Sequence, residues 1–194
     1  MELFDLALIW AFIIGFGIIM YVLMDGFDLG IGILFPFAPK EEDRDTMMNT
    51  VAPVWDGNET WLVLGGAGLL AAFPLVYSTI LPALYIGVFL LLAGLIFRGV
   101  AFEFRFKART SRYLWNWAFA GGSTVASFAQ GAVVGAYIQG FEITNRVYTG
   151  GALDWLTPFT VLTGFGLGVS DHHSAAAGCV GRVCDDQRLD AVCG

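Results

Sequence analysis

The chain has 194 residues, of which 57% are hydrophobic and 14% are charged, and its mean hydropathy is +0.69. Charged residues make up roughly 25% of an ordinary soluble domain, so this composition excludes such a domain and predicts an integral membrane protein. The formal net charge of -7 also argues against a nucleic-acid-binding surface, which would need clustered Lys and Arg side chains.

The first predicted element is a membrane helix that starts near Leu6. An uncharged run, LALIWAFIIGFGIIMYVLM, extends from Leu6 to Met24. No basic residue precedes it, so we interpret it as a helix that stays in the membrane and not as a cleaved secretory signal. The segment MDGFDLG (24–30) follows with two carboxylates, and a second uncharged run begins directly after it. We therefore expect the helix to continue through this segment toward Pro36.

Two further helices are predicted from a long uncharged run between Thr60 and Phe97. As a single helix this run would be about 57 Å long, whereas a bilayer core of about 30 Å needs about 20 residues. Pro74 and Pro82 each lack a backbone donor and predict a turn in the segment FPLVYSTILP. We expect one helix over about 50–73 and the next over about 77–104.

The last two predicted helices differ in length. The run from Tyr113 to Phe141 is uncharged and predicts a fourth complete span. Apolar character begins again at Trp155 but stops at Val169, which gives about 23 Å of helix and falls short of a crossing. The sequence thus predicts an all-α integral membrane protein. Its expected parts are a transmembrane four-helix bundle (1–152), an incomplete fifth transmembrane helix (153–169) and a polar, disordered tail (170–194).

Pairs of small residues predict close packing between the helices. Gly26 and Gly30 are four residues apart, and so are Gly131 and Gly135. In lipid, this spacing lets two helix backbones approach closely. We interpret these glycines as the contact surface of a tight bundle.

The basic residues of the loops predict the orientation. Lys40 and Arg44 lie between the first two helices, the turn near Pro74 has no charge, and Arg146 lies between the last two helices. The basic residues around the third loop are Arg98, Arg105, Lys107, Arg109 and Arg112. Since cytoplasmic loops carry an excess of Lys and Arg, we expect the first and third loops in the cytoplasm and the N-terminus in the periplasm.

Five ionisable residues near or within the spans are the candidates for function. They are Asp25, Asp28, Asp56, Glu59 and Arg98. Charged groups at membrane depth are costly, so they mark functional sites by default and usually pair with each other. A carboxylate paired with Arg98 would stay ionised, whereas a partly desolvated one could pass protons. The structural alternatives stay open, because Arg98 could reach the headgroups and Asp25 could mark a helix end.

Metal and haem sites are not expected in this chain. The body from Met1 to Ser170 contains neither His nor Cys, so it offers zinc only carboxylates and haem only methionines. The tail contains His172 and His173 together with Cys179, Cys184 and Cys193. Their spacing, HH-x5-C-x4-C-x8-C, fits no standard metal-binding pattern.

Three motifs in order along the chain resemble those of one protein family. They are MDGFDLGIG, then APVWDGNETWLVLGGAGLLAAFPLVYS, then LLLAGLIFRGVAFEFR. They resemble subunit II of the cytochrome bd-type quinol oxidases, including the cyanide-insensitive variants. The resemblance covers about residues 1–169. It implies a subunit of a bacterial inner-membrane complex that oxidises quinol and reduces dioxygen to water.

The resemblance also implies roles for partners and residues. Haems b and d belong to the partner, subunit I, and a small single-helix subunit is a further partner beside membrane lipid. This chain would hold no redox centre, no metal and no catalytic residue; it would stabilise the haem subunit and help to conduct cytoplasmic protons. The match places the proton path on Asp56 and Glu59. It places a structural ion pair needed for haem integrity on Asp28 and Arg98, with Asp25 and Trp55 beside it.

The stretch after Val169 departs from the family pattern. It reads SDHHSAAAGCVGRVCDDQRLDAVCG and contains every His and Cys of the protein. We interpret it as out-of-frame translation or a gene fragment, with a folded cytosolic tail as the alternative. Two other functions stay open for the chain: a transporter or channel fragment with a polar path through the membrane, and a purely structural or non-functional bundle.

Overall fold

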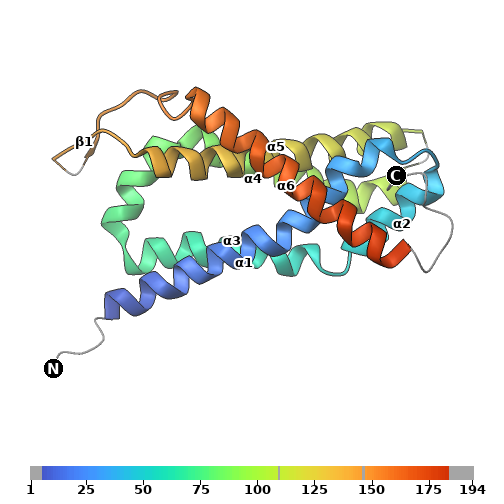
Figure 1. The fold of residues 1–194 in the computed structure, drawn as a ribbon, viewed down its shortest axis with the longest axis horizontal. Helices are drawn as coiled ribbons and strands as arrows, with labels where there is room; N and C mark the ends of the chain where they lie inside the picture. Colours follow the sequence, from blue (N-terminus) through green and yellow to red (C-terminus); the bar gives the residue numbers. More distant parts are fainter. Residues whose placement is uncertain (1–5, 109, 146, 184–194) are drawn as a thin grey trace.

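The computed structural model describes residues 6–108, 110–145 and 147–183, and these form helices and one short hairpin (Figure 1). Arg109, Arg146, Cys184 and Cys193 lie outside the described residues. In chain order the elements are α1 Leu6–Leu34, η1 Phe35–Phe37, α2 Glu41–Val51, α3 Trp55–Ala72, α4 Pro74–Lys107, α5 Arg112–Gln139, β1 Ile143–Thr144, β2 Val147–Tyr148 and α6 Pro158–Val183.

The first helix confirms the expectation for MDGFDLG. Helix α1 continues without interruption through this segment to Leu34, and Pro36 lies in the 3-10 turn η1 that follows. The stretch Leu6–Phe37 and helix α4 are long and apolar enough to cross a membrane. The all-α class is therefore confirmed, and the four complete spans with an incomplete fifth remain a prediction.

The charged segment after Pro36 is a helix and not a loop as expected. Helix α2 carries three carboxylates in its first turn, Glu41, Glu42 and Asp43, where negative charge stabilises the partial positive charge of the helix N-terminus. Pro53 then interrupts the helix because it lacks a backbone N–H. Helix α3 consequently begins at Trp55, five residues after the predicted start.

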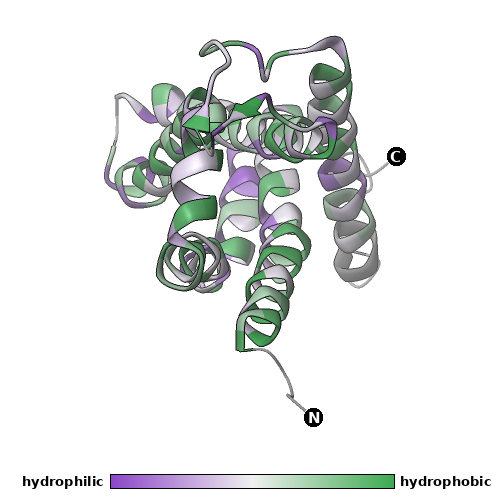
Figure 2. Cartoon of the chain, turned by 90° about the vertical axis from the view of Figure 1, so that its left-hand side faces the viewer, coloured by the Kyte–Doolittle hydropathy of each residue, from purple (hydrophilic) through white to green (hydrophobic). Residues whose placement is uncertain are grey.

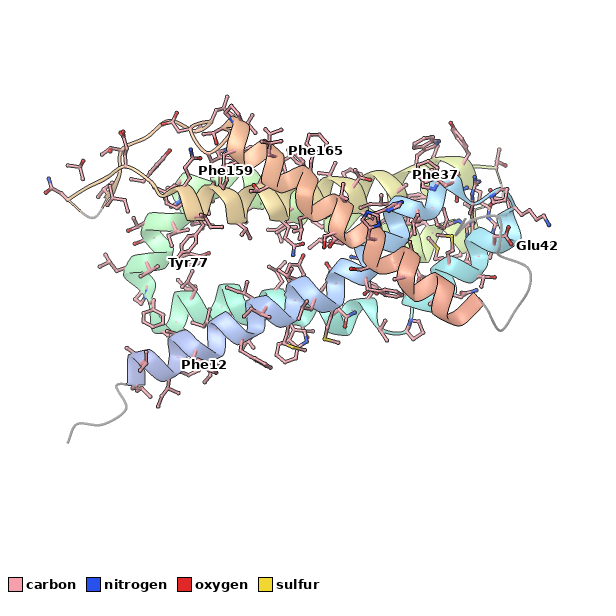
Figure 3. The ribbon with its side chains drawn as sticks, viewed as in Figure 1. Phe12, Phe37, Glu42, Tyr77, Phe159 and Phe165 are labelled. Carbon is pink, nitrogen blue, oxygen red and sulfur yellow. The ribbon has the colours of Figure 1, made fainter. Side chains whose placement is uncertain are left out.

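The chain reverses direction over Pro74 to Pro82 as expected, but this segment is helical and not an irregular turn (Figure 1). Phe73 alone separates α3 from α4, because Pro74 occupies the first turn of α4, where a missing N–H costs nothing. Pro82 lies inside α4, and the ribbon bends sharply in this region (Figure 1), as a proline inside a helix causes. Tyr77 lies on the short arm before the bend, which runs across the end of the bundle (Figure 3).

The final helix is longer than predicted. Thr157 accepts a hydrogen bond from the Thr160 N–H, 3.3 Å, and Pro158 follows it, which is a helix start. Helix α6 then continues beyond Val169 to Val183. Helix α6 thus extends beyond the predicted end at Val169 and replaces the disorder expected over residues 170–183, because it packs along α1 and α5.

The helices pack around small residues. Helix α5 lies between α4 and α6, and α1 contacts α3, α5 and α6. A Cβ added to Gly30 on α1 would overlap the backbone of Asp171 on α6, and one added to Gly131 on α5 would come within 2.6 Å of the Thr163 carbonyl oxygen on α6. The predicted role of these glycines as helix contacts is confirmed.

The outer surface is strongly apolar. Along α1 the exposed side chains Leu8, Phe12, Phe16 and Leu23 recur at helical spacing, and Phe12 is 78% exposed. Figure 2 shows α1 as hydrophobic over most of the arm that leads to the N-terminus. Phe12, Phe159 and Phe165 also stand on outer helix surfaces (Figure 3). Such a surface suits lipid or a partner subunit better than water.

Candidate functional site: a buried ion cluster around Arg98

One arginine on α4 lies at the centre of the candidate site. Arg98 is fully buried, and its Nη1 donates a hydrogen bond to Asp25 Oδ1, 2.8 Å. Its Nη2 lies 3.6 Å from Asp28 Oδ2, and its Nη1 lies 3.7 Å from Glu59 Oε1. Four of the five predicted ionisable residues therefore come together from three helices.

Helix geometry explains why these groups meet. Asp25 and Asp28 are three residues apart, so they share one face of α1. Asp25 lies nine residues before the end of α1, and Arg98 lies nine residues before the end of α4, which places both about 14 Å from the same end of the bundle. The cluster thus lies well inside the bundle and not at a helix end.

The pairing within the cluster differs from the prediction. The expected ion pair between Asp28 and Arg98 is present, but the shorter, hydrogen-bonded contact of Arg98 is with Asp25. Asp28 instead accepts a hydrogen bond of 2.7 Å from the Asn58 side-chain amide. The reason is that Asn58 on α3 approaches Asp28 and leaves Asp25 as the nearest acceptor for the guanidinium.

The cluster has more carboxylates than cations. Asp25, Asp28 and Glu59 face one guanidinium, so three negative charges minus one positive charge leaves a formal excess of two negative charges. Several buried polar atoms here have no hydrogen-bond partner among the described residues: Asp25 Oδ2, Asp28 Oδ1, Glu59 Oε1, Arg98 Nε and Arg98 Nη2. Buried polar groups normally find a partner in protein or water. The carboxylate oxygens can therefore accept a hydrogen bond from water or take up a proton, and the Arg98 nitrogen atoms can donate to water.

Asp56 and Trp55 lie outside this ion cluster. Asp56 is exposed in the first turn of α3, one helical turn before Glu59. Trp55 is half-buried and stacks on Phe102 of α4, with ring centroids 5.0 Å apart. Trp55 thus fixes the start of α3 against α4. The carboxylates become progressively more buried, from the exposed Asp56 through the half-buried Glu59 to the buried Asp25 and Asp28 of α1.

A further carboxylate was missed because it follows Val169. Asp171 on α6 is buried, and its carboxylate accepts a hydrogen bond from the Ser127 hydroxyl of α5. It also lies against Gly26, directly after Asp25 on α1. Because the composition becomes polar after Val169, the sequence predicted that Asp171 belongs to a disordered tail. The spacing of Gly164, Gly168, Asp171 and Ala175, which share the buried face of α6, gave no apolar pattern that would reveal that face.

A second buried arginine was interpreted only as a loop charge. Arg105 of α4 pairs with Asp45 at 2.5 Å and Glu41 at 3.1 Å, both on α2, and donates to Asn116 Oδ1 of α5 at 2.5 Å. Burial raises the pKa of the Asp45 carboxyl, but hydrogen bonds from Arg112 and Arg105 outweigh burial and hold this pKa below its ordinary value. These contacts attach α2 to α4 and α5.

The described residues do not assemble a metal site. Among them, no group of three or more His, Cys, Asp and Glu side chains is placed to hold a metal ion. The rings of His172 and His173 contact each other with centroids 5.6 Å apart. The side chain of Cys179 lies outside the described residues, as do Cys184 and Cys193.

Comparison with known proteins assigns the chain to a family. Residues 6–177 match the family model for cytochrome bd terminal oxidase subunit II. The chain is 36% identical over 167 residues to cytochrome bd-I ubiquinol oxidase subunit 2 of Escherichia coli (strain K12), covering 82% of this chain and 44% of that protein.

Two other relatives agree. Identity is 37% over 167 residues to the probable cytochrome oxidase subunit 2 of Haemophilus influenzae, covering 82% of this chain and 44% of that protein. It is 34% over 138 residues to cytochrome bd ubiquinol oxidase subunit 2 of Bacillus subtilis, covering 70% and 41%. The chain spans less than half the length of these relatives. The match to the family model nevertheless includes every residue of the Arg98 cluster, and the chain belongs to the cytochrome bd terminal oxidase subunit II family.

Proposed function

We propose that this chain is an accessory subunit of a membrane quinol oxidase, in which it stabilises a haem-bearing subunit I and helps to conduct cytoplasmic protons. Haems b and d belong to subunit I, quinol and dioxygen are the substrates of the complex, and a small single-helix subunit is a further partner. The complex lies in the bacterial inner membrane. Family membership and the names of the relatives support this function.

The orientation rests on the two charged connections. Helix α2 and the link between α4 and α5 lie at the same end of the bundle (Figure 1). Lys40, Arg44, Lys107 and Arg112 belong to this end. We assign it to the cytoplasm, which places the N-terminus in the periplasm.

The single observation that supports proton conduction is a graded series of carboxylates. Asp56 is exposed, Glu59 is half-buried, and Asp25 and Asp28 are fully buried beside Arg98. Asp56 would take a proton from the cytoplasmic side and pass it to Glu59, one turn deeper. The excess of carboxylates over Arg98, with its unpaired oxygen atoms, would then hold the proton.

Arg98 has a different role in this proposal. A guanidinium stays protonated in proteins, so Arg98 supplies a fixed positive charge that keeps three carboxylates in one buried place. Trp55, stacked on Phe102, would keep α3 and therefore Glu59 in register with α4. Stabilisation of the haem subunit would depend on this rigid contact between α1, α3 and α4.

Co-purification tests the proposed function. A tagged chain, expressed with the genes that neighbour its own, should bring down a haem protein and quinol-dependent oxygen uptake. Asp56→Asn should slow oxygen uptake on the order of tenfold or more while haem is retained. The matched control is Glu42→Gln, an exposed carboxylate of α2 at the same end (Figure 3), which should leave oxygen uptake unchanged.

The remaining variants separate the roles. Arg98→Ala and Asp28→Asn should lose haem from the purified complex, measured by its absorbance spectrum. Haem loss in Asp56→Asn, or full haem content in Arg98→Ala, would reverse the assigned roles. If no haem protein is recovered with the chain, the oxidase proposal fails and the transporter or channel alternative gains support.

A further inference from the structure

A network of charged side chains outside the Arg98 cluster joins α2 to the start of α5. Arg105 is saturated, because its Nε, Nη1 and Nη2 all contact acceptors on Asn116, Asp45 and Glu41. Arg112 pairs with the same two carboxylates, and Arg44 pairs with Glu41 at 2.6 Å. Three guanidinium groups therefore share two carboxylates.

This network has one positive charge too many. Three positive charges minus two negative charges leaves a formal excess of one positive charge among these linked residues. Arg44 is the guanidinium of this network that also lines a cavity. Its Nη1 donates to Glu41 Oε1 at 2.6 Å, but its Nη2 makes only a long contact of 3.5 Å with the Pro36 carbonyl. An anion in the cavity would offer Nη2 a better acceptor.

A cavity lies beside Arg44 at the same place. It has a volume of about 80 Å³ and is lined by Phe35, Pro36, Arg44, Tyr113, Asn116 and Trp117. A buried water needs about 10–15 Å³ on this measure, so the cavity accommodates a group larger than water. Arg44 provides the donor, since the Asn116 amide is already engaged with Glu41 and Arg105, and η1 provides an apolar floor.

The rim of the cavity has the character of a membrane interface. Tyr113 and Trp117 are 67% and 55% exposed, and their rings contact each other edge to face at 6.2 Å. Trp and Tyr are enriched at the level of lipid headgroups. Leu114, 66% exposed, adds a third large apolar side chain to this rim at the start of α5.

We propose that this cavity binds the phosphodiester headgroup of an anionic phospholipid. Arg44 would donate to the phosphate, and Tyr113 and Trp117 would pack against the glycerol and the first part of the acyl chains. Basic pockets at the ends of membrane helices bind anionic headgroups by the same chemistry. The apolar rim favours a lipid over free phosphate, which would use only the donors.

Native mass spectrometry of the full chain in detergent tests this site. Phosphatidylglycerol and phosphatidylcholine are added in equal amounts, and the retained copies of each lipid are counted. The wild-type chain should retain phosphatidylglycerol preferentially. Arg44→Gln should reduce that preference about fivefold, the factor that corresponds to about 1 kcal/mol for one basic side chain at an anionic membrane surface. Arg44→Lys, which keeps the charge, should retain most of the preference.

Matched variants exclude non-specific attraction. Lys107 carries the same charge at the same end, is 72% exposed, pairs with Glu103 and does not line the cavity. Lys107→Gln should therefore leave the preference unchanged, and an equal loss in this variant would overturn the proposal. Trp117→Leu should weaken retention of both lipids and provides a test that leaves Arg44 in place. Displacement of phosphatidylglycerol by inorganic phosphate would instead identify a free-anion site and overturn the assignment to lipid.

Discussion

Two buried arginines seven residues apart on α4, Arg98 and Arg105, differ in how completely they are paired. Arg105 donates from all its nitrogen atoms to two carboxylates and an amide, and these contacts attach α2 to the bundle. Arg98 faces three carboxylates but makes a single hydrogen bond to them, and two of its nitrogen atoms have no hydrogen-bond partner among the described residues. A saturated arginine holds structure in place, whereas an unsaturated cluster can also accommodate a proton.

The largest effect should come from removing the deep charge. Arg98→Met leaves three carboxylates near one another without a cation, which should cost about 3–5 kcal/mol of folding stability. We expect a lower amount of the chain in the membrane fraction, measured by immunoblot and by fluorescence-detected size-exclusion chromatography, with haem missing from the complex that remains. The double variant Arg98→Met with Asp25→Asn should recover part of the yield, because one uncompensated charge is removed. Normal yield in Arg98→Met alone would contradict the buried cluster.

A smaller and more local effect is expected at the shallow arginine. Arg105→Met removes charge-assisted hydrogen bonds to Asp45 and Glu41, and we expect a loss of about 2 kcal/mol. The loss should appear as faster hydrogen exchange in α2, with α1 unchanged around Asp25. If hydrogen exchange increases equally in α1 and α2, the Arg105 network and the Arg98 cluster do not stabilise separate parts of the bundle, which would contradict the comparison between the two arginines.

The Asp45 carboxyl gives this network a defined pH dependence. Its pKa in the folded protein lies below the ordinary value, which is about 3.9. Its contribution to stability is therefore present above about pH 4 and is lost as the pH falls through the lowered pKa. Asp45→Asn should lower the thermal unfolding midpoint at pH 7, and the difference from wild type should shrink at pH 3. If Asp45→Asn lowers the unfolding midpoint by as much at pH 3 as at pH 7, the stabilisation does not come from the ionised Asp45 carboxylate.

The smallest effect is expected for an exposed pair on the same helix. Lys107 and Glu103 are 72% and 65% exposed and four residues apart on α4. Such a pair contributes about 0.3–0.5 kcal/mol, so Lys107→Gln should leave the unfolding midpoint nearly unchanged. A large shift would mean that burial does not separate the structural arginines from the surface charges.

The sequence predicted the parts that depend on uncharged length and on proline. The continuous course of α1, the positions of α4 and α5, and the meeting of Asp25, Asp28, Glu59 and Arg98 all follow from run length, helical spacing and loop charge. The pairing of Arg98 with Asp25 did not follow, because it depends on how Asn58 of α3 approaches Asp28. Neighbouring helices, and not local sequence, decide which acceptor is free.

Helix α2 and the second half of α6 were not predicted, because their sequence patterns are weaker indications of a helix. The acidic first turn of α2, Glu41 to Asp43, is typical of a helix start, but the high charge of this segment suggested a loop. The change of composition after Val169 concealed the rest of α6 and with it Asp171. Residues 170–177, which include Asp171, also fall within the match to the family model. The proposal of out-of-frame translation stays a prediction, and sequencing the gene beyond the Val169 codon tests it.

The bend in α4 sets the register of the Arg98 cluster. Glu59 lies 14 residues before Phe73, since 73 minus 59 is 14, and Arg98 lies 16 residues after Pro82, since 98 minus 82 is 16. The arm from Pro74 to Pro82 crosses the end of the bundle and holds α3 and α4 apart there (Figure 1). The two remaining lengths, about 21 Å and 24 Å, run in opposite chain directions and approach each other where Trp55 stacks on Phe102. The number of residues between Pro82 and Arg98 therefore fixes where the guanidinium lies. One residue inserted between them would rotate the guanidinium about the helix axis by about 100° and remove it from its carboxylates.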